Sequence, residues 1–427
     1  MSIGILVLMF FLIAIGMPIG FAMGVSGAIG IILYSDFASF LGIIGTSPYR
    51  TAASLLLTTI PMFIFMANIA STGSIVKDLF NVANRWVGHV PGGMAIATIL
   101  SSAGFGAVSG SSTASTATMA NIATKQMISF GYNSSLSAGI VAVGGTIAIL
   151  IPPSVPLVLF GILTESSIGK LLIAGIIPGI LTTITFSIFT WLYAKRNPDI
   201  MPAQERVSWL ERFYSLKSTW GFILLFLAVI VSIYSGFTTA TEAAALGALV
   251  AIFITLLTKK LTWEAFKQAL HDTASTTSMI FTIVIGATIF GYFLTITRIP
   301  QQIITSISEW ALPAWSILCI VLLIYIVLGF FMDQIAILIL TLPLVYPLMV
   351  DLGYESIFLG IIIVKTVEIG LLTPPLGMNV FVASSESGIP VKDVFRGVLP
   401  YVYVDLINLL ILCTFPILST WLPGIMR

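Results

Sequence analysis

The hydrophobic pattern of this chain is a series of apolar stretches, each about 16 to 25 residues long, that recur from one end to the other. Stretches of this length match the hydrocarbon thickness of a bilayer. In lipid they must be helical, because each unpaired backbone group there costs several kcal/mol. The pattern therefore predicts an all-α, multi-spanning membrane protein.

A second pattern is an internal repeat with a shift of about 222 residues. This shift places Gly131-Tyr132 on Gly353-Tyr354 and Pro152-Pro153 on Pro374-Pro375. Further matches run through both halves: Pro91 with Pro313, Met127 with Met349, Lys170 with Lys392, Gly175 with Gly397, and Pro178 with Pro400. The sequence predicts two copies of one unit, residues 1–215 and 216–427.

Each copy is expected to hold short spans, a surface arm, a re-entrant hairpin, a broken span and a closing span. In the first copy, the spans are expected at residues 3–16, 19–34, 51–70 and 171–194. The arm is expected at 35–50, the hairpin at 92–128 and the broken helix at 136–164. In the second copy, the arm is expected at 259–272, the hairpin at 313–350 and the broken helix at 356–386, with spans in the equivalent places.

The broken helix crosses the membrane once, so each copy crosses an odd number of times and the second copy is inverted. Basic residues then fall mainly on one side, which the positive-inside rule identifies as cytoplasmic. These are Lys77, Arg85, Lys125, Lys195, Arg196, Arg206, Arg212, Lys217, Lys259, Lys260, Lys267, Lys392 and Arg396, against Arg50, Lys170, Arg298 and Arg427. Both termini are predicted to be periplasmic, and inverted repeats with broken helices are typical of secondary transporters.

Composition narrows the class further. Hydrophobic residues make up 58% of the 427 positions and charged residues 8%, with a mean hydropathy of +1.10, whereas a soluble domain has roughly 25% charged residues. The net charge of +1 is spread without long basic blocks and predicts no nucleic-acid partner. Residues 3–16 have no basic residue before them and are expected to belong to the mature protein rather than to a signal peptide.

The strongest local signal is GFGAVSGSSTAS at 104–115, between helix-compatible apolar segments. Small and hydroxyl residues suit a hairpin tip that lines a polar cavity. Free amides and the hydroxyls of Ser109, Ser111, Ser112 and Thr113 can hold an anion or complete a cation shell. Close helix packing by small residues is the alternative.

The equivalent stretch of the second copy is GFFMDQ at 329–334, in which Asp333 aligns with Ser111. A carboxylate at membrane depth is costly, so Asp333 is a functional candidate. The alternative is that it caps the following half-helix.

Each copy also carries a paired-proline break, with Gly144-Gly145-Thr146 before Pro152-Pro153 and Glu368-Ile369-Gly370 before Pro374-Pro375. Proline removes a donor, so the preceding carbonyls lose their partners inside the membrane. Such carbonyls are suitable ligands for a hard monovalent cation such as Na⁺. A plain structural kink is the alternative.

Four ionisable residues lie in apolar surroundings. Lys365 and Glu368 are three apart on one helix and are expected to neutralise each other. Glu242 and Asp405 stand alone in apolar runs and are interpreted as caps or as groups that form intersubunit hydrogen bonds, with a proton carrier as the alternative. Residues 261–271 are amphipathic and are expected to lie in the membrane interface.

Together these motifs resemble the large membrane subunit of tripartite ATP-independent periplasmic (TRAP) transporters, and the resemblance covers essentially the whole chain. It rests on GFGAVSGSSTAS, IPPS at 151–154, TEAAALGAL from Thr241, and TPPLGMN from Thr373. The resemblance implies a scaffold and a transport domain with two hairpins, elevator motion, and Na⁺ as coupling ion. It also implies an inner-membrane location and two partners: a separate small four-helix membrane subunit and a periplasmic binding protein that delivers an organic acid.

The resemblance also implies site residues. One Na⁺ site would lie between the first hairpin tip and the first break, the second between their counterparts, and the substrate between the tips. The first Na⁺ site is assigned to Ser109, Ser112, Gly145, Leu150 and Pro152, the second to Gly329, Gly370, Thr373 and Leu376, and the substrate to Gly110, Ser111, Thr113, Asp333 and Asn379.

Two other functions stay open at this point. A stand-alone Na⁺-coupled carboxylate transporter would need neither partner subunit. A membrane-embedded enzyme would need a catalytic dyad, for which only Asp333 with Asp405 is available, because the sequence has no HExxH, P-loop or Ser/His/Asp motif. The substrate itself, whether a dicarboxylate, a sialic acid or another sugar acid, does not follow from the sequence.

Overall fold

The computed structural model describes residues 2–72, 75–309 and 312–425, and their side chains except those of 2–3 and 307–309. Every regular element among these residues is helical. Six described helices are long and apolar enough to cross a membrane, and a bent pair, Phe37–Ala52 with Leu56–Thr72, passes the same test. The prediction of an all-α, multi-spanning membrane protein is confirmed.

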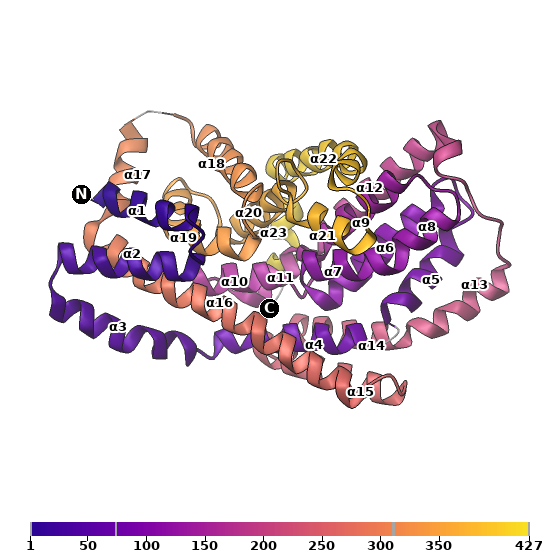
Figure 1. Cartoon of the computed structure of the whole chain (residues 1–427), viewed down its shortest axis with the longest axis horizontal. Helices are drawn as coiled ribbons and strands as arrows, with labels where there is room; N and C mark the ends of the chain where they lie inside the picture. Colours follow the sequence, from indigo (N-terminus) through magenta and orange to yellow (C-terminus); the bar gives the residue numbers. More distant parts are fainter. Residues whose placement is uncertain (1, 73–74, 310–311, 426–427) are drawn as a thin grey trace.

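One group of helices packs around a long, sloping helix, α16, which Figure 1 shows along the lower side of the molecule. In this group α2 packs on α16, α4 packs on α15, and α4 and α16 also contact each other. Its members are α1 (Ser2–Ala14), α2 (Ile19–Tyr34), α3 (Phe37–Ala52), α4 (Thr59–Thr72), α14 (Trp220–Tyr234), α15 (Ala240–Leu257) and α16 (Trp263–Thr297). We call this group the frame.

Small residues let the backbones of α2 and α16 approach closely. A Cβ atom added at Gly286 would lie 1.9 Å from the carbonyl oxygen of Gly20, and one at Gly27 would lie 2.7 Å from the Cα of Phe290. Helices in lipid associate through such close contacts. The hydrophobic effect does not drive them together there, because lipid tails are as apolar as the side chains. We call this contact the glycine seam; it makes α2 and α16 one rigid unit.

A second group contains both hairpins and both broken helices, and we call it the core group. Its first half comprises α6 (Gly93–Ser109), α7 (Ser112–Met119), a π-helical turn (Ala120–Thr124), α8 (Lys125–Ser129), α9 (Ser134–Thr146), α10 (Val155–Leu163), α11 (Ile168–Ala174) and α12 (Ile176–Arg196). Its second half comprises α18 (Ala314–Gly329), α19 (Gln334–Asp351), α20 (Ser356–Gly370), α21 (Met378–Ser387), α22 (Val391–Thr414) and α23 (Ile417–Gly424). Helices end and begin at both predicted tips and at both proline pairs, whereas the assignment of these helices to re-entrant hairpins, broken spans and two repeats stays a prediction.

The two halves of the core group interlock. The half-helix after the first break, α10, packs on α19 of the second hairpin, and the half-helix after the second break, α21, packs on α7 of the first. Phe160 meets Tyr346 edge-on in the first contact, with ring centroids 5.9 Å apart. Each hairpin is therefore held by the broken helix of the other half.

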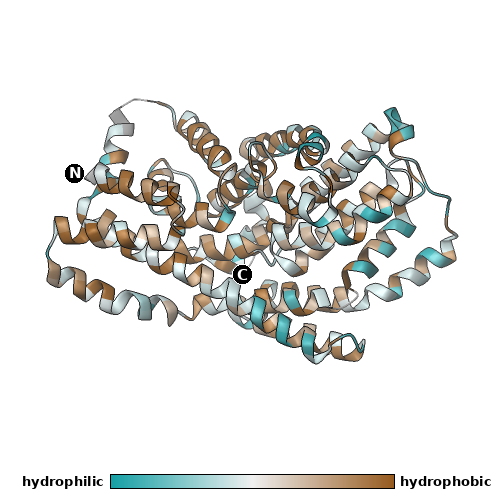
Figure 2. Cartoon of the chain, in the orientation of Figure 1, coloured by the Kyte–Doolittle hydropathy of each residue, from teal (hydrophilic) through white to brown (hydrophobic). Residues whose placement is uncertain are grey.

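Short amphipathic helices connect the frame to the core group, and the sequence reading missed them. They are α5 (Ile75–Val87) before the first hairpin, α17 (Ile299–Glu309) before the second, and α13 (Trp209–Ser215) between the halves. Figure 2 shows hydrophilic residues gathered toward the right of the view, around α5, α8 and the end of α12, whereas α1 and α2 are mainly hydrophobic.

The two arms differ, contrary to the expectation of two equivalent surface helices. Residues 37–52 form a separate helix, bent by 49° from the helix that follows. Residues 261–271 form no separate helix, because α16 starts at Trp263 and runs unbroken for 35 residues. Pro48 lies inside α3, whereas no proline interrupts α16 before Pro300 and its first glycine is Gly286.

Candidate cation and substrate site

The tip of the first hairpin is a sharp reversal between α6 and α7. Gly110 ends α6 with φ of 59°, in the left-handed region that glycine adopts without strain. Ser111 then caps α7 by accepting a hydrogen bond from the amide of Ala114 at 3.4 Å. The tip therefore turns within two residues, deep in the core group.

This tip is closed against the first break. The amide of Val155 donates to the carbonyl oxygen of Gly110 at 3.2 Å. A Cβ atom added at Gly110 would lie 2.4 Å from the carbonyl oxygen of Pro153. No side chain other than hydrogen fits there, so tip and break form one joined structure.

Beside this junction lies a set of buried hydroxyls with no hydrogen-bond partner among the described residues: Ser112, Ser115 and Thr116. An added Cβ atom at Gly145 would lie 1.9 Å from Oγ1 of Thr116 and 3.0 Å from the carbonyl oxygen of Ser112. Buried polar atoms without partners are rare and need an explanation. The Thr116 hydroxyl and the Ser112 carbonyl are neutral oxygens, the kind of ligand that suits a monovalent cation, and they lie against Gly145, so the structure brings Ser112 and Gly145 together as the sequence predicts.

Thr116 is a candidate that the sequence reading missed. It lies one helical turn after Ser112 on α7, so both side chains lie on the same face. That i, i+4 spacing was the available signal, because it places a second oxygen beside the first.

Three other residues are predicted to belong to the first cation site, namely Ser109, Leu150 and Pro152. The hydroxyl of Ser109 is buried and donates to the carbonyl of Ser111 at 3.5 Å. The carbonyl oxygen of Leu150 would lie 2.0 Å from a Cβ atom at Gly175, so this oxygen is turned toward the start of α12. Pro152 is buried and joined to Pro153 by a cis peptide bond.

The hydroxyls predicted to touch the substrate lie on the outer side of the first tip. Ser111 and Thr113 are partly exposed, and their hydroxyls lie 3.2 Å apart. They differ from Ser112, Ser115 and Thr116, which are fully buried. The first tip thus presents one row of hydroxyls inward and another outward.

The second tip meets the second break at a pair of glycines. A Cβ atom added at Gly329 would lie 2.7 Å from the Cα of Gly370, so α18 and α20 touch there. Beyond this contact tip and break diverge around a cavity of about 240 Å³, which Gly329, Phe330, Phe331, Met332, Leu376, Met378 and Phe381 line. Leu376 is 45% exposed, and the Thr373 hydroxyl donates to the carbonyl of Ile369 at 2.6 Å.

Asp333 caps α19, accepting from the amide of Ile335 at 3.0 Å. This confirms the capping interpretation. Contact of the same carboxylate with substrate stays a prediction.

Asn379, at the start of α21, is fully buried, and neither atom of its side-chain amide has a hydrogen-bond partner within the described chain. Its helix packs on α7 and α9 of the other half and on the π-helical turn between α7 and α8, from which Asn121 donates to Glu386 at 2.7 Å. An orphaned amide at the meeting point of the halves fits a group that waits for a ligand.

Of the two isolated acids, Glu242 was interpreted correctly and Asp405 was not. Glu242 completes a capping box with Thr239, as a cap was expected. Asp405 was taken as a lone acid, and this is wrong: it contacts Nζ of Lys365, which also lies 3.2 Å from Glu368. The expected Lys365–Glu368 pair is confirmed, but it is part of a three-residue cluster.

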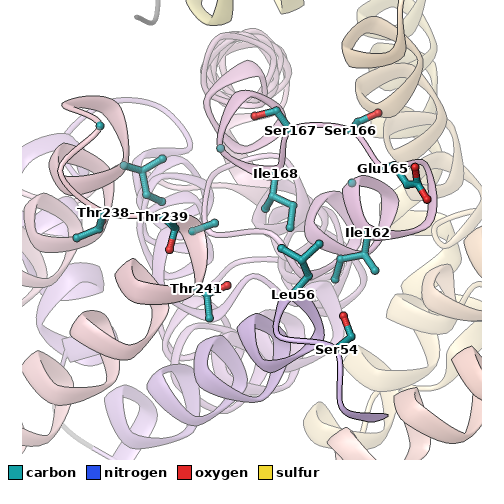
Figure 3. A pocket seen from close by; sticks show the side chains of 15 residues that line it. Ser54, Leu56, Ile162, Glu165, Ser166, Ser167, Ile168, Thr238, Thr239 and Thr241 are labelled. Carbon is teal, nitrogen blue, oxygen red and sulfur yellow. The ribbon is translucent and has the colours of Figure 1, made fainter. Parts of the chain in front are cut away.

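A cavity of about 680 Å³ lies where the core group meets the frame (Figure 3). The loop between α10 and α11, with Glu165, Ser166 and Ser167, forms one wall. The opposite wall comes from Ser54 and Leu56 and from the α14–α15 connection with Thr238 and Thr239. None of the predicted site residues lines it.

Comparison with known proteins gives a consistent result. The family described as "Tripartite ATP-independent periplasmic transporter, DctM component" matches residues 6–418. The C4-dicarboxylate TRAP transporter large permease protein DctM of Pseudomonas aeruginosa is 37% identical, covering 94% of each chain. The isethionate TRAP transporter permease protein DctMQ of Oleidesulfovibrio alaskensis is 30% identical over 96% of this chain and 65% of its own.

Among solved structures, the chain is similar to the YdaH transporter of Alcanivorax borkumensis, with a TM-score of 0.64 and 14% identity, covering 92% of this chain and 91% of that one. This likeness concerns the fold alone.

Proposed function

Since the chain belongs to the DctM family of tripartite ATP-independent periplasmic transporters, we propose that it is the Na⁺-coupled permease subunit of a transporter that imports an organic acid. Its relatives are transport proteins of the inner membrane rather than enzymes, and the chain is a multi-pass member of that class. The single observation that carries the Na⁺ coupling is the unpartnered buried hydroxyl of Thr116, which lies with the Ser112 carbonyl against Gly145.

The chemistry of these donors favours a monovalent cation. The first site offers hydroxyl and carbonyl oxygens of Ser112 and Thr116, and the second offers the backbone of Gly329 and Gly370 with Thr373. The described residues hold no group of three or more His, Cys, Asp or Glu suited to a metal ion. Ca²⁺ sites normally include carboxylates, and softer metals require nitrogen or sulfur ligands.

The substrate class follows from a similar argument. The partly exposed hydroxyls of Ser111 and Thr113, the Gly110 turn and the orphaned amide of Asn379 are neutral donors, which suit a carboxylate or sulfonate group. The named substrates of the two relatives, a C4-dicarboxylate and isethionate, carry such groups. Asp333 would contact a hydroxyl or amide of the substrate rather than its acid group.

We propose an elevator motion in which the core group shifts past the frame. The rigid glycine seam supports a fixed frame, and α5 and α17 supply connections to the hairpins on either side. The cavity of about 680 Å³ between the two groups provides room for relative movement. Cations at both breaks would order the hairpin tips, and substrate would then dock between them.

The partners proposed are a separate small membrane subunit and a periplasmic substrate-binding protein, with both termini of this chain in the periplasm. The family is tripartite by its description. The DctMQ relative is longer than this chain, as expected where the small subunit is fused to the large one. A stand-alone carrier is the alternative, and strict dependence on a binding protein separates the two.

The test is uptake of radiolabelled organic acids into proteoliposomes that hold this chain, with and without the small subunit and binding protein, under an inward Na⁺ gradient. Uptake is expected only when all three proteins and Na⁺ are present. Uptake by the chain alone would support the stand-alone carrier, and uptake that is equal in K⁺ would refute Na⁺ coupling.

A further inference from the structure

Two of the connections between the frame and the core group pack against each other. The first is α5, which leads from α4 of the frame to α6, and the second is α13 with the 3₁₀ turn Leu216–Thr219, which leads from α12 back to α14 of the frame. The indole N–H of Trp86 donates to the carbonyl of Arg212 at 3.2 Å, and the Trp86 ring meets Phe213 edge-on. The two connections therefore meet in one place, at the right of Figure 1.

A cavity of about 430 Å³ lies between these two connections, and we call it the joint cavity. Its lining includes Asp78, Asn81 and Arg85 of the first connection, and Tyr214, Lys217 and Ser218 of the second. Each connection contributes one cation, Arg85 or Lys217, whereas Asp78 contributes one carboxylate. The joint cavity is therefore positively charged.

These cations have no anionic partner within the described chain. None of the ion pairs among the described residues involves Arg85, Lys217 or the nearby Arg212. Arg212 is only 6% exposed, and its Nε has no hydrogen-bond partner among the described residues. Arginine stays protonated at physiological pH, and a charge buried without a counter-ion is costly. The excess of cations favours an anion as ligand.

Beside the joint cavity, α13 presents an apolar face that no described part of the chain covers. It consists of Trp209, Leu210, Phe213 and Tyr214, at i, i+1, i+4 and i+5 of the helix, and all four side chains are exposed. Leu210 is 82% exposed. In a membrane protein, such a face suits contact with lipid chains.

The length of the adjoining span places α13 near the membrane surface. Residues Trp209–Tyr234 form one candidate span of 26 residues. At roughly 1.5 Å per residue this is about 39 Å, against about 30 Å for the hydrocarbon of a bilayer, so one end of the span reaches the headgroup layer. Tryptophan and tyrosine concentrate in that layer, and Trp86, Trp209 and Tyr214 gather around the joint. The cavity therefore lies at the depth of the lipid phosphates.

We infer that the joint cavity binds a phospholipid with a net negative headgroup. Arg85 and Lys217 hold its phosphate, and its acyl chains lie along the apolar face of α13. Because the cations come from different connections, the lipid ties together the two joints between frame and core group. This inference does not depend on the coupling ion or on the transported substrate.

Two other occupants match part of this surface. A soluble organic phosphate would match the charge but leave the apolar face of α13 uncovered. An acidic segment of the small subunit would match both, but only if it reached this joint. An anionic phospholipid matches the charge, the apolar face and the depth together, and the surrounding membrane supplies it.

The experiment measures the melting temperature of the purified full-length chain in neutral detergent with added dioleoyl-phosphatidylglycerol. Dioleoyl-phosphatidylcholine keeps the total lipid constant, so only the headgroup charge varies. A ligand that binds the folded state raises the melting temperature. The wild type is expected to show saturable stabilisation by phosphatidylglycerol. Glycerol 3-phosphate, a soluble headgroup without acyl chains, should not reproduce it.

The double variant Arg85→Gln/Lys217→Gln is expected to raise the half-saturating fraction of phosphatidylglycerol about 25-fold, or about fivefold for each cation removed. Its melting temperature in phosphatidylcholine alone should stay close to that of the wild type. Lys267→Gln is the matched control, because Lys267 is also exposed and also lies over an aromatic ring, that of Trp263, but outside the joint cavity. It should leave the half-saturating fraction unchanged.

Four outcomes would overturn the inference. They are equal stabilisation by phosphatidylcholine, equal stabilisation by glycerol 3-phosphate, an equal shift in Lys267→Gln, and an unchanged half-saturating fraction in the double variant. If the double variant does not fold, the single variants Arg85→Gln and Lys217→Gln decide, with an expected shift of about fivefold each. The measurement is repeated with the small subunit bound. Loss of the phosphatidylglycerol response there would assign this surface to the partner instead of a lipid.

Discussion

The two tip–break pairs occupy equivalent places in the predicted repeat but differ in how far they are closed. In the first pair the Val155 amide donates to the Gly110 carbonyl, and buried hydroxyls gather beside the junction. In the second pair Gly329 touches Gly370, but Phe331 and Leu376 then border a mainly apolar cavity of about 240 Å³. A tip and break that are already joined can bind a cation without rearrangement, whereas a tip and break that diverge must first close around it. We therefore expect the first pair to bind its cation before the second, and substrate to close the second.

The largest expected effect comes from the tip of the first pair. Gly110→Ala forces a side chain into the left-handed region, at a cost of about 1–2 kcal/mol. It also places Cβ 2.4 Å from the Pro153 carbonyl. Na⁺-driven uptake should fall below about a tenth of the wild type. The matched change at the second tip, Met332→Ala, borders a cavity and should keep more than about half of the uptake. Equal losses would show that both tips are equally closed.

The next effect concerns the inward hydroxyls. Thr116→Val is close to isosteric and should raise the half-saturating Na⁺ concentration about tenfold, because one ligand is lost. In Na⁺-free buffer the same change should stabilise the protein by about 1 kcal/mol, since an unpartnered buried hydroxyl disappears. Melting curves with and without Na⁺ measure both.

The control for this change is Thr373→Val in the second pair, whose hydroxyl already donates to Ile369. It should not stabilise the Na⁺-free protein. Stabilisation by Thr116→Val with unchanged Na⁺ affinity would contradict a ligand role for Thr116.

A smaller effect is expected from filling the cavity of the second pair. Leu376→Trp places a larger side chain between tip and break, so closure should be hindered and uptake reduced about fivefold. Stabilisation by Na⁺ at the first pair should persist, because the joined tip is untouched. Leu410→Trp, on an exposed face of α22, is the matched control. Loss of the Na⁺ response in Leu376→Trp would show that the two pairs do not bind independently.

The smallest expected effect is a pH dependence of stability that arises in the segment before the first hairpin. His89, between α5 and α6, lies 3.3 Å from a guanidinium nitrogen of Arg212. Its pKa is lowered, first by burial and then by Arg212 and Arg206. The unfolded chain then binds more protons, so stability is present above pH 6.5 and is lost as the pH falls through the folded pKa. The segment before the second hairpin, 299–313, has no histidine.

Because His89 is only partly buried, a drop in melting temperature of about 1–2 °C is expected between pH 7.5 and 5.5. His89→Gln should remove this drop. A drop that persists in the variant would place the titrating group elsewhere.

The sequence was informative where structure depends on local chemistry. Proline pairs locate both breaks, and small or capping residues at 109–111 and 333 locate both tips, because these residue types restrict the backbone wherever they occur. The acid at Glu242 was assigned to a cap for the same reason. The membrane class followed from the lengths of the apolar stretches alone.

The sequence was uninformative where structure depends on contacts between distant helices. Asp405 pairs with a lysine forty residues away on another helix, and no local pattern indicates that distance. Thr116 is a candidate cation ligand only because Gly145 lies against it, and this contact depends on the packing of α9 on α7. The amphipathic connectors α5 and α17 were missed because their polar faces do not resemble spans. The unequal closure of the two pairs is likewise a property of packing.

The glycine seam has a consequence for how the protein is made. The face of α2 that carries Gly20 and Gly27 is completed only by α16, which is synthesised more than two hundred residues later. At about 5–20 residues per second, this face waits roughly 10–50 s in the bilayer before its partner emerges. During biogenesis α2 therefore depends on a chaperone, an insertase or the surrounding lipid, and a bulky substitution at Gly27 would act first as a defect of assembly and quality control.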